Sequence, residues 1–298
     1  MSENIKQSLR ALLSEIVDYA GLFPPSASPM QRAVENYAEY LNSEHRWMLG
    51  RFVCPVARLA EFGENAGEFL NGKIVWRLSA LIGENLAEDL QKIENFNAAN
   101  DGRAVIDAIE IKAVEPKDIN LAKKLLPANL AAYFEIPLQL YINEFISAIA
   151  INRLRAKIRT GGVTKEAFPP VDEVVKFLRV CIAANLPFKA TAGLHHPLRC
   201  QRALTYEENA TQGVMHGFLN VFSAAAFLRQ NLNAKFINQV MTETEVSRFE
   251  FDDEGIVWNG NRVDLAQIRL MRERNAISFG SCSFTEPIED LRQLGLLH

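Results

Sequence analysis

Six charged residues lie inside or at the ends of short apolar runs of the sequence, and they are Glu110, Lys112, Glu135, Lys157, Arg159 and Lys189. Buried charge is costly unless it is paired or used in chemistry. A lysine whose pKa is lowered by burial and by neighbouring cations can attack a carbonyl, a carboxylate can move protons, and a guanidinium can hold an anion. These residue types therefore indicate an enzyme that acts on a small anionic carbonyl or hydroxy-acid compound.

The elements that must position these residues are short strands alternating with helices. Eight apolar runs are expected to be strands, over residues 47–54, 74–81, 104–112, 130–136, 154–160, 188–192, 217–222 and 276–281. Most are followed by a segment of helical periodicity. Eight alternations predict the α/β class and a (β/α)8 barrel of the TIM type, in which the C-terminal strand ends form the active site.

The period of two along each strand assigns the inward face. On the third to sixth expected strands that face carries Glu110, Lys112, Glu135, Lys157, Arg159, Lys189 and Thr191. His195 continues the inward face beyond the sixth strand. A structural alternative stays open, because barrels also bury ion pairs between neighbouring strands, and Glu135 with Lys157 or Arg159 would make one.

The run Pro187-Phe188-Lys189-Ala190-Thr191-Ala192-Gly193 resembles the Lys-x-Thr-x-Gly stretch on the sixth strand of class I aldolases of the deoxyribose-phosphate type. The resemblance covers about five residues and the barrel class, and no specific family is recognised. It implies a Schiff base on Lys189, assisted by an acid on the fourth strand, where Glu135 stands. The second lysine of that family has no counterpart in 217–222, and Lys157 is the candidate to replace it.

The leading hypothesis is accordingly a lyase with aldolase-like, carbon–carbon chemistry. Lys189 is the candidate nucleophile or electrostatic stabiliser, and Glu135 and His195 are the candidates for proton transfer. The expected substrate-binding residues are Arg159, Lys112, Lys157, Glu110, Thr191, Asn220 and Ser281. Cys282, out of register with Ser281, is expected in the core.

Two other functions remain open. One is a metal-assisted enolising enzyme with Glu110, Glu135 and His195 as ligands, although the leading hypothesis needs no metal and no cofactor. The other is a non-catalytic barrel that binds or assembles through its late hairpin.

The chain is predicted to be a single barrel domain over residues 1–298, with extra helices in 1–45 and a β-hairpin insertion at 248–263, where Asn259-Gly260 is a turn signal. Between the two N-terminal helices, the loop from Asp18 to Pro25 is expected either to plug the N-terminal mouth with Leu22 and Phe23 or to act as a lid that contributes Asp18 or Tyr19 to the site. The run 217–222 is ambiguous, because it could be a helix while the hairpin supplies a strand.

Composition favours a small-molecule partner. The 298 residues carry a formal net charge of -4 without a run of Lys or Arg, which argues against nucleic acid and anionic membrane as partners. No basic leader or apolar run of about 18 residues is present, and the four cysteines are widely spaced, so a cytoplasmic protein with reduced thiols is expected. A homo-oligomer stays open.

Overall fold

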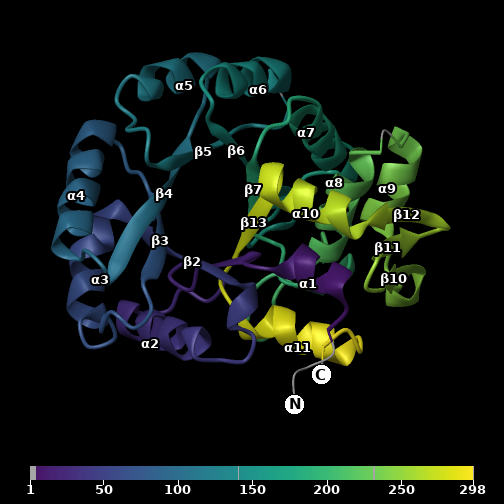
Figure 1. The fold of residues 1–298 in the computed structure, drawn as a ribbon, viewed down its shortest axis with the longest axis horizontal. Helices are drawn as coiled ribbons and strands as arrows, with labels where there is room; N and C mark the ends of the chain where they lie inside the picture. Colours follow the sequence, from purple (N-terminus) through teal and green to yellow (C-terminus); the bar gives the residue numbers. More distant parts are fainter. Residues whose placement is uncertain (1–4, 140, 231, 298) are drawn as a thin grey trace.

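A computed structural model describes residues 5–139, 141–230 and 232–297. Eight parallel strands close into a barrel, in the order β1-β2-β3-β4-β5-β6-β7-β13 (Figure 1). The strands are β1 (Val17–Tyr19), β2 (Leu49–Pro55), β3 (Trp76–Leu81), β4 (Ala104–Lys112), β5 (Ala131–Glu135), β6 (Arg155–Arg159), β7 (Phe188–Thr191) and β13 (Ala276–Ser281). The predicted (β/α)8 barrel is confirmed.

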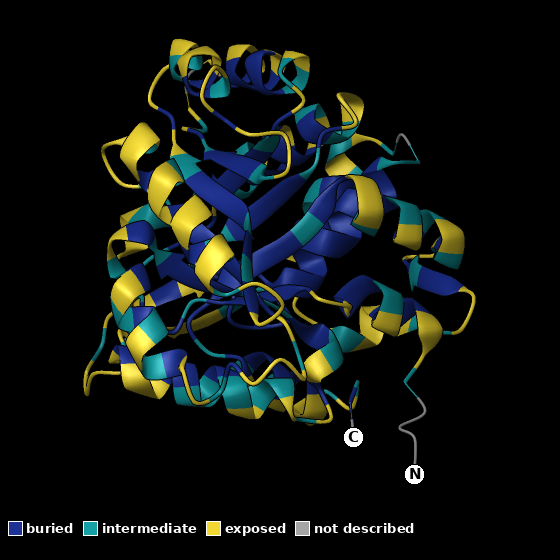
Figure 2. Cartoon of the chain, turned by 60° about the vertical axis from the view of Figure 1, so that its left-hand side comes forward, coloured by how far each residue is buried: buried dark blue, intermediate teal, exposed yellow. Residues whose placement is uncertain are grey.

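Each barrel strand is followed by a helix, and these helices are α2 (Met30–Leu41), α3 (Leu59–Ala66), α4 (Leu86–Ala99), α5 (Pro116–Lys123), α6 (Ile142–Ile151), α7 (Val171–Ala183), α8 (Phe218–Leu228) and α11 (Thr285–Gln293). Three further helices are α1 (Gln7–Leu13), α9 (Ala234–Thr242) and α10 (Leu265–Arg274), and short 3-10 turns cover Arg46–Met48, Val56–Arg58, Lys165–Ala167 and Val246–Arg248. The helices expose their outer faces and bury the faces that cover the strands (Figure 2). Among the described residues, no helix is long and apolar enough to cross a membrane.

The first barrel strand lies where the sequence pattern indicated an apolar loop. Val17–Tyr19 pairs with β13 on one side and with β2 on the other, so it closes the barrel. Among the described residues, α1 is the one helix that precedes the barrel, because α2 is the helix that connects β1 to β2. Three residues are too few to show an alternating pattern, which explains why this strand was not predicted.

The expected strand at 217–222 is wrong, because this run begins α8. All eleven residues of α8 are buried, so the helix has no polar face and its sequence shows neither the helical nor the strand period. With β1 counted, Lys189 lies on the seventh barrel strand instead of the sixth, and each earlier strand also moves up by one.

The late insertion forms a three-stranded antiparallel sheet of β10 (Phe249–Phe251), β11 (Gly255–Trp258) and β12 (Asn261–Asp264), outside the barrel. Asn259 and Gly260 have φ of +48° and +73°, as the predicted Asn-Gly turn requires. Figure 1 shows this sheet on the side of the barrel where α8, α9 and α10 lie. A second, unpredicted sheet of β8 (Cys200–Ala203) and β9 (Gln212–Met215) interrupts the connection from β7 to α8.

Candidate functional site

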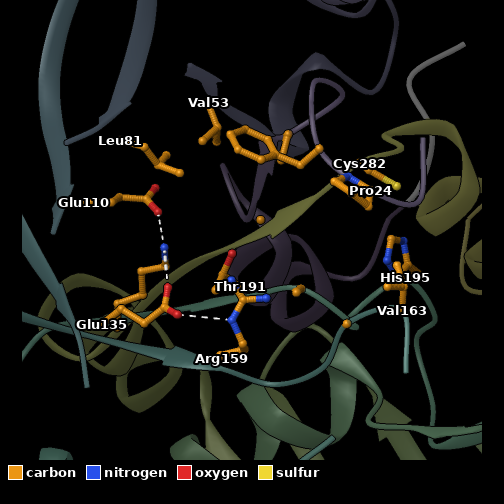
Figure 3. Close-up of a pocket in the computed structure, with 16 residues that line it drawn as sticks. Pro24, Val53, Leu81, Glu110, Glu135, Arg159, Val163, Thr191, His195 and Cys282 are labelled. Atoms are coloured by element: carbon orange, nitrogen blue, oxygen red, sulfur yellow. Dashed lines mark hydrogen bonds and ion pairs between the residues drawn. The ribbon is translucent and has the colours of Figure 1, made fainter. Parts of the chain in front are cut away.

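A cavity of about 250 Å³ opens at the C-terminal ends of the barrel strands. The predicted residues that line it are Glu110, Glu135, Lys157, Arg159, Thr191 and His195, and the other lining residues include Phe23, Pro24, Val53, Leu81 and Cys282 (Figure 3). Phe23 therefore lies at the C-terminal end of the barrel, opposite to the plug position expected for it. The cavity combines apolar walls with a few charged groups, as small-molecule sites usually do.

A buried charge network forms the floor below this cavity. Lys189 Nζ donates to Asp18 Oδ2 at 2.6 Å and to Glu110 Oε1 at 2.5 Å, and Lys157 Nζ donates to Glu110 Oε2 at 2.5 Å. All four side chains are at most 5% exposed. Ser79 donates a further hydrogen bond to Glu110. Two cations face two carboxylates, so the floor is electrically balanced.

The backbone of β2 makes room for Asp18. A Cβ atom built on Gly50 would lie 2.4 Å from Asp18 Oδ1, which is less than contact distance. The backbone N–H of Arg51 donates to the same oxygen at 2.8 Å, and the hydroxyl of Ser278 donates to Oδ2 at 2.8 Å. Gly50 therefore allows a carboxylate into the barrel next to Lys189.

Lys189 does not have the lowered pKa that the sequence argument expected. Burial acts to lower the pKa of Lys189, but Asp18 and Glu110 outweigh it and raise the pKa above its ordinary value. The expected repulsion by nearby cations is outweighed because Asp18, which was expected in a lid, accepts a hydrogen bond from Lys189. The same two lysines lower the pKa of Glu110 against the effect of its burial. Lys189 is a charged partner of two carboxylates in this structure.

Above the floor, Glu135 lies between the buried network and the exposed Arg159. Its carboxylate lies 2.9 Å from Lys157 Nζ and 3.1 Å from Arg159 Nε. Burial acts to raise the pKa of Glu135. The opposite effect of Lys157 and Arg159 is larger, so the pKa of Glu135 lies below its usual value. The Arg159 side chain is 54% exposed. Its Nε faces Glu135 (Figure 3), and the exposed remainder of the guanidinium can meet a ligand.

His195 occupies another part of the wall, in the loop after β7. Its Nδ1 lies 3.2 Å from Glu286 Oε2 and 3.5 Å from Ser281 Oγ. Burial acts to lower the pKa of His195, but hydrogen bonds and charge from Cys282 and Glu286 raise it to about 9. His195 is therefore protonated at neutral pH. The adjacent His196 points to a different partner, with Nδ1 2.6 Å from Asp290 Oδ2.

Three predicted substrate-binding residues lie elsewhere. Lys112 is exposed and lines a separate groove with Glu135 and Arg159. Asn220 is buried in α8. Its side-chain amide donates to the carbonyl oxygens of Val240, in α9, and Glu243, directly after α9, so it links the two helices. Ser281 contacts His195 but is not among the residues that line the cavity.

Sequence reasoning missed Cys282 and gave Asp18 the wrong location. Asp18 was considered as a site residue carried by a lid, and it lies instead on the first strand of the barrel. Cys282 was assigned to the core and lines the cavity. A signal for Cys282 existed, because Ser278, Gly280 and Cys282 share the period of two and Ser278 reaches Asp18 inside the barrel.

The ligand set of the metal hypothesis is not assembled. In the parts of the chain that the structure describes, no three His, Cys, Asp or Glu side chains are placed to hold a metal ion. Glu110 is instead held by Lys157 and Lys189.

No protein-family model matches the chain, and no curated protein is similar to it. Among solved structures, the chain aligns with a novel GH10 endoxylanase retrieved from a sugarcane soil metagenome. That alignment covers 91% of this chain and 100% of the other, with 9% sequence identity and a TM-score of 0.38.

Proposed function

We propose that this protein is an enzyme that binds a small anionic carbonyl or hydroxy-acid compound in the cavity and acts on it as a carbon–carbon lyase. The observation that carries the proposal is the pair of proton-transfer groups in one cavity with pKa values displaced in opposite directions. Glu135 is a carboxylate at neutral pH and His195 is an imidazolium. Such a pair supplies a base and an acid at the same pH.

The substrate anion would bind at Arg159, whose side chain is half exposed at the mouth. A guanidinium presents parallel N–H donors that match a carboxylate or phosphate. Lys157 lies deeper, and its Nζ is 2.5 Å from Glu110 Oε2 and 2.9 Å from Glu135 Oε2. It is therefore placed to stabilise negative charge on a substrate oxygen.

In the cleavage direction, Glu135 takes the proton of a substrate hydroxyl, and that oxygen forms a carbonyl as the neighbouring carbon–carbon bond breaks. The bond electrons form an enolate, whose oxygen is stabilised by Lys157. His195 then donates a proton to the enolate carbon. Lys189 acts as a buried charge that holds Asp18 and Glu110. In this mechanism no Schiff base forms on Lys189, and the enolate is stabilised electrostatically by Lys157 instead.

A panel of small keto acids, aldehydes and hydroxy acids tests this proposal. Ligand binding would be measured by thermal shift, turnover by proton NMR, and imine formation by borohydride reduction with intact-mass measurement. We expect a binding compound, turnover that falls at least about 100-fold in Glu135→Gln, and no borohydride adduct. An adduct that disappears in Lys189→Met would restore the Schiff-base mechanism. A panel without binding or turnover would overturn the lyase proposal and favour a non-catalytic barrel.

We also propose that residues 1–298 form one domain, as the sequence suggested. The three-stranded sheet has no core of its own, because Phe249, Ile256, Trp258 and Val263 belong to the same apolar cluster as the barrel. The cytoplasmic location stays a prediction.

A further inference from the structure

The thiol of Cys282 lies in the wall of the cavity, directly after β13. Gly280 and Cys282 both line the cavity, and Cys282 is 5% exposed. A small reagent that enters the cavity can therefore reach this sulfur, although Cys282 is almost fully buried. Figure 3 shows Cys282 on the same side of the cavity as His195, away from Glu110 and Glu135.

Polar groups from three separate segments converge around this sulfur. Tyr206, in the loop between β8 and β9, has its hydroxyl 3.7 Å from Cys282 Sγ and 3.4 Å from Glu286 Oε2. Glu286, at the start of α11, also contacts Nδ1 of His195 at 3.2 Å. His195 and Cys282 both line the cavity, and Ser281, the neighbour of Cys282 in the chain, has its hydroxyl 3.5 Å from Nδ1 of His195. A thiol, an imidazole and a carboxylate, the groups that an activated cysteine nucleophile uses, thus gather at one wall of the cavity.

The other thiols of the chain lack such surroundings. Cys54 and Cys181 are fully buried, and burial raises the pKa of Cys54 to about 12 and raises that of Cys181 as well. Cys200 is partly exposed, and desolvation raises its pKa too. Cys282 differs from these three thiols because its sulfur lies in the cavity wall, beside the hydroxyl of Tyr206 and on the same side of the cavity as His195.

We propose that Cys282 is a nucleophilic thiol that forms a reversible covalent adduct with a small aldehyde in the cavity, with His195 as its proton-transfer partner and Glu286 as the residue that positions His195. The sulfur–carbon bond forms as the carbonyl π bond breaks. The imidazolium of His195 donates its proton to the former carbonyl oxygen, which becomes the hydroxyl of a hemithioacetal, while the thiol proton passes to water and His195 regains a proton from water. Addition needs no oxidant and reverses by the same route. This inference rests on the cavity and does not depend on the lyase chemistry.

The first test is the rate of alkylation by iodoacetamide at pH 7, followed for each cysteine by peptide mass spectrometry. We expect Cys282 to react at least about tenfold faster than Cys200, because a neighbouring histidine activates a thiol as a nucleophile. His195→Gln should slow Cys282 about tenfold, and Glu286→Gln should slow it less. Cys200→Ser is the control and should leave the rate at Cys282 unchanged.

The second test uses the wild-type chain and carbon-13-labelled glyoxylate, an anionic aldehyde. A new resonance of a tetrahedral carbon should appear with wild type and be absent with Cys282→Ser, and glyoxylate should protect Cys282 from alkylation better than glycolate, which has no carbonyl. Equal rates at Cys282 and Cys200, or equal protection by glyoxylate and glycolate, would overturn the proposal. These tests measure alkylation and adduct formation and require no turnover. Both results can therefore be interpreted even if the lyase proposal fails.

Discussion

Replacing Lys189 with Met removes the cation at the centre of the buried network, and it should destabilise the fold strongly. Lys189 is 1% exposed and contacts both Asp18 and Glu110. Glu110 keeps Lys157 as its partner at 2.5 Å in the variant. Asp18 keeps the hydroxyl of Ser278 and one backbone N–H, but no other ion pair of Asp18 is found within the described residues.

One buried carboxylate is thus left without a counter-charge. Removing one partner of a buried pair costs about 3–5 kcal/mol, which corresponds to a fall in Tm of roughly 6–15 °C for a protein of this size. Asp18→Asn combined with Lys189→Met removes both charges. The double variant should therefore be more stable than Lys189→Met alone by about 1–3 kcal/mol, which is the range of coupling between residues in contact.

Urea unfolding at pH 7, followed by circular dichroism, measures these values, and an unchanged slope shows that the free energies are comparable. Lys176→Met is a matched control, because Lys176 is an exposed lysine of α7 and its loss should change stability by less than about 0.5 kcal/mol. The reasoning fails if Lys189→Met loses less than about 1 kcal/mol, or if the double variant is no more stable than the single one.

Three further outcomes are expected. Arg159→Leu should abolish binding of an anionic ligand with little change in Tm, whereas Arg155→Leu, at the opposite end of β6 where the guanidinium bonds Tyr133, should keep binding; a large fall in Tm for Arg159→Leu would make it a structural partner. His195 has a folded pKa raised to about 9, so its stabilisation is complete below about pH 6.5 and is lost as pH rises through 9; urea unfolding across this window should show a steeper loss of stability in wild type than in His195→Gln, which keeps only the slope from other groups such as the buried cysteines. Gly50→Ala places a Cβ against the Asp18 carboxylate and should cost about 1–3 kcal/mol in the same assay, while an unchanged stability would mean that β2 shifts freely.

The hydrophobic pattern alone predicted the barrel and most of its strands. Strands buried by helices on one side and by the barrel interior on the other appear as short apolar runs with turn residues between them, and Glu110, Lys157 and Lys189 stood out because charge inside such runs is rare. Their inward direction followed from the period of two, and the structure places all three inside the barrel. Local sequence carried this information because alternation is a property of one strand at a time.

Only the tertiary structure decided which charges meet. Asp18 lies 171 positions from Lys189 in the chain, and a three-residue strand brings the two side chains to 2.6 Å. That contact reverses the expected direction of the Lys189 pKa, because the pKa of a buried group depends on partners from other strands as much as on its own desolvation. The meeting of His195 with the segment that carries Cys282 and Glu286 likewise required two parts of the chain far apart in sequence to converge, and no periodicity within one segment records such a meeting.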